Sequence, residues 1–203
     1  MPIHSDYISD ILARFEGVMR NGYVPCRKKN FFGHGNAADF GDPLGASGVT
    51  IGAGLDLGQQ DAAALERMGL PADLRRLFAP YLGKKRVAAM QALAAAPLAV
   101  SEEQCEAVNR AVHADYIRRA AALHDRHAER PFADIPAQAQ AVLVSLFYQL
   151  GSPFPADGHP GYPTVFGFLC RADWQAAVHE LRTGFRRYAS RRRQEADILA
   201  EVL

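Results

Sequence analysis

The sequence predicts an α+β protein that is mainly α, with a small β lobe and a larger helical lobe. Residues 23–58 are rich in glycine and aspartate, and apolar residues alternate with polar ones over short stretches. Both features are typical of irregular β structure. An apolar helical stripe precedes this region, and an almost wholly helical run follows it from Gln60. We expect one domain over 1–203, with lobes at about 1–60 and 61–203 flanking a cleft, the usual place for a ligand. The first helix is expected to pack on the helical lobe.

The first expected helix covers 5–20. Ser5 is a residue type that caps helices, and the apolar residues that follow recur at three- and four-residue spacing as one buried stripe: Ile8, Leu12, Phe15 and Met19. Asn21-Gly22 is expected to end this helix.

Glu16 lies along this stripe, four residues after Leu12 and three before Met19. Desolvation beside apolar surface favours the protonated form of a carboxyl group, as a general acid near neutral pH requires. The alternative is a solvated glutamate on the exposed rim of the helix.

The run 48–58 predicts a strand with one apolar face and one bare face, because apolar residues alternate with glycine and polar residues. Thr50 and Asp56 are the functional side chains on the bare face. In a straight strand they would lie ~20 Å apart. The glycines between them allow a bend that would bring the hydroxyl and the carboxylate together.

The remaining chain predicts helices at 61–68, 71–82, 86–96, 101–124, 136–150, 164–170, 173–182 and 188–202. Ser101-Glu102-Glu103-Gln104 is a capping-box pattern that opens the longest of them. The helix at 136–150 is apolar nearly all round, so we expect it at the centre of the core. A loop rich in proline and glycine covers 152–163.

Composition excludes several classes of function. The 203 residues carry 23 basic and 22 acidic side chains, so no strong field points to nucleic acid or to a membrane as partner. No stretch resembles a membrane span, and the N-terminal residues resemble no signal peptide, so we expect synthesis in the cytoplasm. Cys26, Cys105 and Cys170 are widely spaced and are expected to be reduced thiols, with Cys26 as a nucleophile an open alternative.

Motifs along nearly the whole chain carry a family resemblance. Phe15-Glu16-Gly17 is followed by Tyr23-Val24-Pro25, and Thr50-x5-Asp56 is followed by Leu57-Gly58-Gln59. In the helical half, the matching segments are 144–151, 163–169, 173–177 and 191–195. This order of motifs resembles the phage-type (T4-like) lysozyme superfamily. Because threonine precedes aspartate, the chain most closely resembles the pesticin-like muramidase branch.

This resemblance implies a lysozyme-like fold and a glycoside hydrolase that cuts the β-1,4 bond between N-acetylmuramic acid and N-acetylglucosamine in peptidoglycan. Glu16 would protonate the departing oxygen, while Asp56 and Thr50 would hold and activate a water, so the configuration would invert. Which of these two dominates stays open. Gln149, Tyr148 and His34 are expected to contact substrate, and no metal or cofactor is implied.

Other residues and functions are alternatives to this hypothesis. Asp39 and Asp42 could replace Asp56 as the second carboxylate, although aspartates in loops more often form turns. His113, His124 and His127 lack companions that would make a metal set. A lytic transglycosylase, which needs no water-activating aspartate, and a catalytically inactive module that binds cell wall are the alternative functions.

The segment 27–46 is longer than in the phage pattern and is a candidate substrate loop. Near the C-terminus six arginines crowd together: Arg182, Arg186, Arg187, Arg191, Arg192 and Arg193. Acidic residues interleave with them, so we expect a solvated face or a patch for the anionic wall rather than a nucleic-acid site.

The expected partner is the glycan strand of peptidoglycan, bound by a monomer without membrane insertion. An antibacterial effector or toxin and an endolysin both fit, and each would act in the periplasm or cell wall after delivery or host lysis. A toxin delivered to the periplasm would need a cognate immunity protein in its producer.

Overall fold

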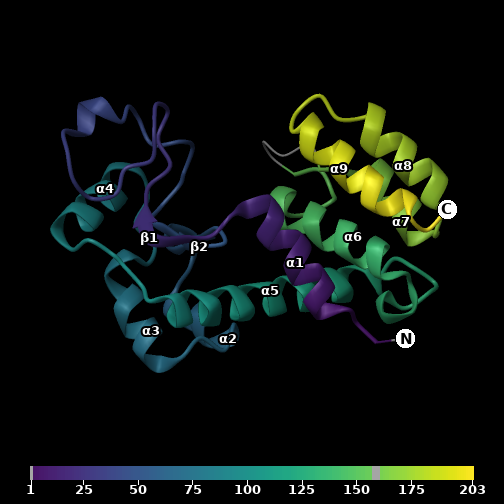
Figure 1. The fold of residues 1–203 in the computed structure, drawn as a ribbon, viewed down its shortest axis with the longest axis horizontal. Helices are drawn as coiled ribbons and strands as arrows, with labels where there is room; N and C mark the ends of the chain where they lie inside the picture. The colour runs from purple at the N-terminus through teal and green to yellow at the C-terminus, as the bar shows by residue number, and fades with distance from the viewer. Residues whose placement is uncertain (1, 157–160) are drawn as a thin grey trace. The chain divides into compact units, whose positions relative to one another are not determined.

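The computed structural model describes residues 2–156 and 161–203, and Figure 1 shows its helices and strands. The chain forms two compact units, one from Met1–Phe15 with Ala114–Leu203 and one from Glu16–His113. The helices at 62–67, 72–78 and 86–95 belong to the same unit as the sheet, whereas the sequence predicts them in the helical lobe. Helices make up 58% of the structure beside one small antiparallel sheet, which confirms the predicted mainly helical α+β class.

In the unit Glu16–His113, the strands β1 (Met19–Tyr23), β2 (Thr50–Gly52) and β3 (Leu55–Asp56) form an antiparallel sheet in that order. Strands β2 and β3 form a hairpin through Ala53 and Gly54, so the predicted single strand at 48–58 is wrong in detail. Gly52 and Gly54 have φ angles of +63° and +101°, which only glycine adopts readily. The expected bend is therefore a reversal of direction.

Helix α1 (Ser5–Glu16) ends four residues earlier than predicted. Gly17 follows it with φ at +67°, the left-handed conformation that stops helices. Met19 consequently lies in β1 and not on the helical stripe. Ile8 and Leu12 are buried in the core of the first unit, and Phe15 packs against it, which confirms the rest of the stripe.

The other helices agree with the sequence pattern to within a few residues. In the unit that holds the sheet they are α2 (Ala62–Arg67), α3 (Ala72–Phe78) and α4 (Arg86–Ala95). The single-turn 3₁₀ helices are η1 (Ala37–Asp39), η2 (Leu57–Gln59), η3 (Ala79–Tyr81) and η4 (Phe132–Asp134). Helix α5 (Glu102–His124) begins at the predicted capping box, where Ser101 and Gln104 exchange hydrogen bonds of 3.0 and 3.1 Å.

Helix α6 (Ala137–Leu150) is the centre of the other unit's core, as its apolar pattern predicts. Its residues from Ala139 through Phe147 are all buried. Around it pack α7 (Pro163–Cys170), α8 (Trp174–Thr183) and α9 (Ala189–Ala200). Part of the predicted loop at 152–163, residues 157–160, lies outside the described residues. Among the described helices, none is both long and apolar enough to cross a membrane.

Candidate active site

Thr50 and Asp56 are direct partners across the β2–β3 hairpin, and Tyr23 is the partner of Thr50 across β1–β2. Tyr23, Thr50 and Asp56 therefore form a row across the sheet. Directly opposed residues in antiparallel strands share a face, with Cβ atoms about 5 Å apart. The neighbouring pair, Ile51 and Leu55, points the other way and is buried. The sheet thus separates an apolar face from a face that carries chemical groups.

The carboxylate of Asp56 is fixed by backbone amides. Its Oδ1 accepts hydrogen bonds from the N–H groups of Gly48 at 3.0 Å and Gly58 at 2.9 Å, and it caps η2. Burial raises the pKa of this carboxyl group, while these amides, the Gln59 side chain and the charge of Lys85 oppose the rise. A half-buried carboxylate with a raised pKa is a better proton acceptor than an exposed one.

The glycines beside Asp56 are required by close approach. A Cβ on Gly48 would lie 2.5 Å from Cα of Gly58 and 2.7 Å from Oδ1 of Asp56. A Cβ on Gly58 would lie 2.5 Å from the carbonyl oxygen of Lys84. Only residues without side chains let these backbones enclose the carboxylate, so the glycine-laced run builds this site as well as bending the chain.

Glu16 is the last residue of α1, half-buried, and belongs to the same unit as the sheet. The phenol of Tyr23 interacts electrostatically with the carboxylates of Glu16 and Asp56. Burial raises the pKa of its phenol, and the charges of Glu16 and Asp56 raise it further. Both carboxylates are thus near enough to this hydroxyl to act on it electrostatically.

Tyr23 is the residue that sequence reasoning missed as a site candidate. Its half-buried ring lies 6.0 Å from that of Phe32. The signal was present as a tyrosine seven residues after Glu16, but its significance comes from pairing with Thr50, 27 residues further along the chain.

Thr50 is only 5% exposed, and its hydroxyl donates to the carbonyl of Gly48 at 3.5 Å. The hydroxyl is therefore poorly placed to react by itself. Because Thr50 lies directly opposite Asp56, its hydroxyl is suited to orienting a group bound beside that carboxylate.

The rival carboxylates, Asp39 and Asp42, are both exposed, Asp39 in η1 and Asp42 in the loop that follows. His34 is exposed between Gly33 and Gly35 in the same segment. Cys26 is buried, and burial raises the pKa of its thiol, which disfavours the thiolate that a nucleophile needs.

His113 and His124 are buried, and burial lowers the pKa of each, so the neutral imidazole is favoured. In the part of the chain that the structure describes, no group of His, Cys, Asp and Glu side chains could hold a metal ion.

Tyr148 and Gln149 lie at the end of α6 in the other unit, both half-buried. The ring of Tyr148 lies 4.3 Å from that of Tyr116. The amide oxygen of Gln149 accepts a hydrogen bond of 2.5 Å from Arg192, which fixes the orientation of this amide.

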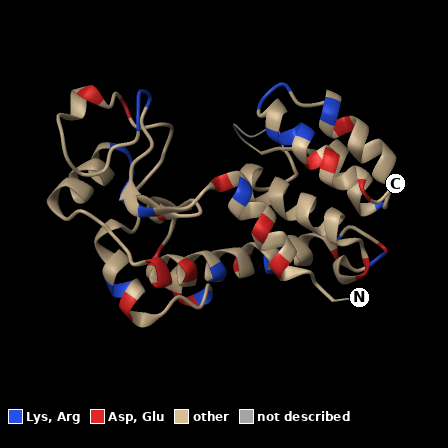
Figure 2. Ribbon diagram, viewed as in Figure 1, with Lys and Arg blue, Asp and Glu red and all other residues tan. Residues whose placement is uncertain are grey.

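The sequence predicts that the C-terminal arginines lie on a solvated face, but not all of them do. Arg192 is fully buried, and Arg191 is largely so. Both pair with the buried Glu195, at 2.8 and 3.3 Å, and Ser145 donates to the same carboxylate at 2.5 Å. Arg182 is exposed and pairs with Asp197 at 2.9 Å, and Figure 2 shows basic and acidic residues mixed on α8 and α9. The sequence pattern could not separate these inward arginines from exposed ones.

Comparison with known protein families decides the relationship. The Pesticin model, described as a bacterial toxin homologue of phage lysozyme, C-terminal part, matches residues 6–175. The chain belongs to the pesticin family. The match includes Glu16, the hairpin with Thr50 and Asp56, and helix α6. Among curated proteins, none matches the chain.

Membership in the pesticin family supports a lysozyme-like function and a glycoside hydrolase chemistry, with peptidoglycan as the implied substrate. The pesticin-like resemblance predicted from the motifs is confirmed.

Proposed function

We propose that this pesticin-family chain is a muramidase that hydrolyses the β-1,4 bond between N-acetylmuramic acid and N-acetylglucosamine. The observation that carries the proposal is the row of Tyr23, Thr50 and Asp56, which sets a fixed carboxylate and a hydroxyl side by side in the unit that also holds Glu16. Glycosidic hydrolysis uses one carboxyl group as acid and a second as base or nucleophile.

In the proposed reaction, Glu16 donates its proton to the glycosidic oxygen as the bond to the anomeric carbon breaks. A water molecule attacks that carbon from the opposite face, and Asp56 accepts the proton that the water loses. Thr50 positions the water by a hydrogen bond. Tyr23, on which the charges of both carboxylates act, would orient the reacting groups without changing its own protonation. Gln149, Tyr148 and His34 remain proposed substrate contacts.

The stereochemistry of the product tests this mechanism. Attack by a water held by Asp56 and Thr50 inverts the anomeric centre, so the β-linked strand should first release the α-anomer. NMR of the anomeric proton, recorded before mutarotation, distinguishes the outcomes. An initial β-anomer would require a covalent intermediate and would rule out this role for the water, and a 1,6-anhydro product would identify a lytic transglycosylase.

Replacing Asp56 separates its chemical role from its structural one. Asp56→Asn keeps an oxygen for the amides of Gly48 and Gly58 but cannot accept a proton, so wall lysis should fall by ~10² or more. Asp56→Ala should also lose lysis, and it should lower the free energy of unfolding by about 1–3 kcal/mol, because both amides lose their acceptor. Turbidity assays and thermal melts of both variants measure this. Full lysis by Asp56→Asn would remove Asp56 from the mechanism.

The pH dependence of stability provides the matched check. Burial raises the pKa of Asp56 in the folded chain above its value in the unfolded chain. The contribution of Asp56 to the free energy of unfolding is therefore fully present below the unfolded-state pKa and is lost as pH rises through the folded-state pKa. Asp56→Asn has no such loss. Its melting temperature relative to wild type should therefore increase between about pH 4 and pH 7. A difference that stays constant with pH would contradict the buried carboxylate.

We also propose that the chain is an antibacterial effector or an endolysin, made in the cytoplasm and acting in the periplasm or cell wall after delivery or host lysis. In an effector, a cognate immunity protein would protect the producer. The family's description as a bacterial toxin homologue supports the effector role.

A further inference from the structure

A cavity lies in the unit that holds the sheet. It has a volume of about 870 Å³ and lies between the segment 27–43 and helix α4. Ligand pockets typically measure about 300–1,000 Å³. None of Glu16, Tyr23, Thr50 and Asp56 lines it.

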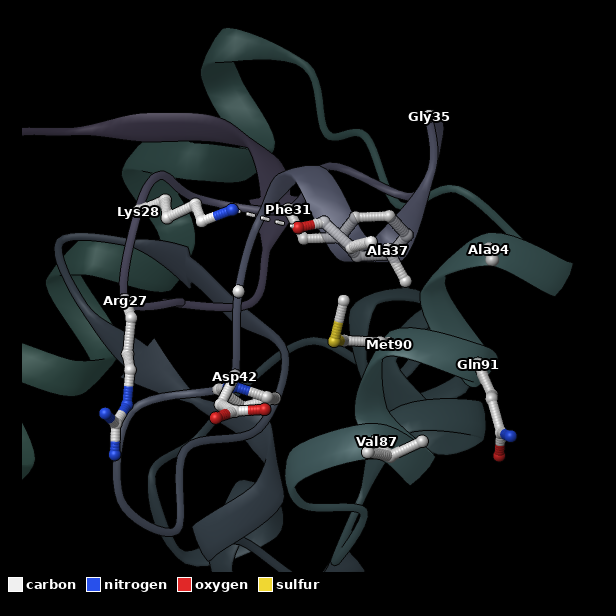
Figure 3. Close-up of a pocket in the computed structure, with 13 residues that line it drawn as sticks. Arg27, Lys28, Phe31, Gly35, Ala37, Asp42, Val87, Met90, Gln91 and Ala94 are labelled. Carbon is white, nitrogen blue, oxygen red and sulfur yellow. Dashed lines mark hydrogen bonds between the residues drawn. The ribbon is translucent and has the colours of Figure 1, made fainter.

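Much of the lining of this cavity is apolar. Val87, Met90 and Ala94 lie on one face of α4, and Met90 projects toward the loop, where Phe31 and Ala37 form the facing wall (Figure 3). Val87 is 58% exposed, so its side chain is accessible to a ligand in the cavity.

Packing holds the loop wall in place. A Cβ on Gly33 would lie 2.7 Å from the backbone oxygen of Leu93, so the loop rests directly on α4. The rings of Phe31 and Phe40 meet edge to face at 5.0 Å, and Lys28 donates to the carbonyl of Ala38 at 3.2 Å. The cavity therefore exists before any ligand arrives, which lowers the cost of binding.

The two segments that form the cavity each carry a basic triplet, Arg27-Lys28-Lys29 on the loop and Lys84-Lys85-Arg86 directly before Val87. They contain all four lysines of the chain. Arg27 and Lys28 line the cavity themselves, and Arg86 precedes Val87 and donates to the carbonyl of Gly45 at 2.9 Å.

All six basic side chains are exposed, and within the part of the chain that the structure describes none of them forms an ion pair. The loop supplies two carboxylates, Asp39 and Asp42, of which Asp42 lines the cavity. Among the residues that line the cavity, the two cations Arg27 and Lys28 outnumber the single carboxylate of Asp42, so the lining favours an anionic ligand.

We propose that this cavity, the loop–α4 pocket, is a subsite for the stem peptide on N-acetylmuramic acid. The inference rests on the proposed muramidase function. A stem peptide has the required chemistry, because it carries the methyl side chains of its alanines and has more carboxylates than ammonium groups. The methyl groups would lie on Val87 and Met90, and the carboxylates would meet Arg27 and Lys28.

The position of the pocket suits a peptide attached to the cleaved sugar. Lys85, whose charge lowers the pKa of Asp56, lies two residues before Val87. Gly48, whose amide binds the Asp56 carboxylate, forms a β-bridge with Lys85. The start of α4 therefore connects the Asp56 carboxylate with the pocket.

A matched pair of variants on α4 tests the proposal. Val87→Glu places a negative charge on the wall of the pocket, whereas Ala88→Glu adds the same charge at the next, exposed position, which does not line it. Calorimetric titration of the full chain with the N-acetylated stem tetrapeptide L-Ala-γ-D-Glu-diaminopimelate-D-Ala measures binding. Val87→Glu should weaken it at least about tenfold by like-charge repulsion, while Ala88→Glu should change it far less.

A second matched pair removes positive charge. Lys28→Gln should weaken binding of the tetrapeptide, whereas Arg76→Gln on α3, which loses the same charge outside the pocket, should not.

Activity on two substrates separates this proposal from the proposed function. Val87→Glu should slow cleavage of peptide-bearing wall but not of glycan strands stripped of peptide by an amidase. If the wild-type chain cleaves neither, the muramidase proposal fails, while the titration still tests the pocket. Equal binding by Val87→Glu and Ala88→Glu, no binding of the tetrapeptide, or equally tight binding of tetraglutamate would each overturn the stem-peptide subsite.

Discussion

Glu16→Gln is expected to lower the rate of wall lysis by about 10²–10⁴ while the chain stays folded. Glutamine has nearly the same shape as glutamate but has no proton to donate to the glycosidic oxygen. Glu16 is half-buried at the last position of α1, where the left-handed Gly17 turns the chain toward β1 and the sheet. The measurement is the clearing of purified wall by wild type and variant at equal concentration.

The control is Glu103→Gln, which makes the same chemical change on the exposed first turn of α5. It should lyse wall at the wild-type rate. Expression of each variant with and without a periplasmic leader tests the proposed place of action, because only active chains that reach the periplasm should lyse the host. Wild-type clearing by Glu16→Gln would exclude Glu16 as the general acid.

Tyr23 provides an independent check on the position of Glu16. The charge of Glu16 raises the pKa of the Tyr23 phenol, so Glu16→Gln should lower that pKa, whereas Glu103→Gln should leave it unchanged. NMR titration of ring-labelled tyrosine, assigned with Tyr23→Phe, measures both. An unchanged Tyr23 pKa in Glu16→Gln would mean that the carboxylate and the phenol lie too far apart to share a site.

The sequence predicted the pairing of Thr50 with Asp56 better than it predicted the local structure. Alternation and glycine content indicated a bend between them, because only glycine permits one within so few residues. Whether the bend is a kink or a reversal depends on whether the two halves of the run pair with each other, as β2 and β3 do. The partner of β2 on its other side, β1, lies 27 residues earlier in the chain and was not predicted as a strand. The sequence predicts the capping box at Ser101 correctly, because its hydrogen bonds join residues only three positions apart.

Long-range contacts explain what the sequence could not predict. The helical period continued through Met19, yet Gly17 ends α1 and Met19 joins the sheet, because pairing with Gly52 outweighs a weak helical preference. The arginine-rich C-terminal helix looked solvated, since arginines are seldom fully buried. Arg192 is buried because Glu195, one turn later, and Gln149 on α6 provide partners.

Arg192→Met is expected to lower the free energy of unfolding by about 3–5 kcal/mol, the largest effect on stability predicted for this chain. Arg192 and Glu195 are both 0% exposed and lie 2.8 Å apart. Methionine fills similar space but leaves Arg191, among the described residues, as the remaining ion-pair partner of the Glu195 carboxylate. For a chain of this size the melting temperature should fall by about 10 °C.

The double variant Arg192→Met with Glu195→Gln decides whether the buried charge is the cause. It removes both charges and keeps an oxygen for Ser145, so it should regain most of the lost stability. The pH dependence supplies a second signature. Burial raises the pKa of Glu195, and the charge of Arg192 opposes this rise, so Arg192→Met should raise the pKa further. The added cost of charging Glu195 is absent below the unfolded pKa and grows as pH rises through the folded pKa. The loss of unfolding free energy in Arg192→Met, relative to wild type, should therefore be greater at about pH 8 than at about pH 5. If the double variant is as unstable as Arg192→Met alone, lost packing and not an unpaired carboxylate explains the role of Arg192.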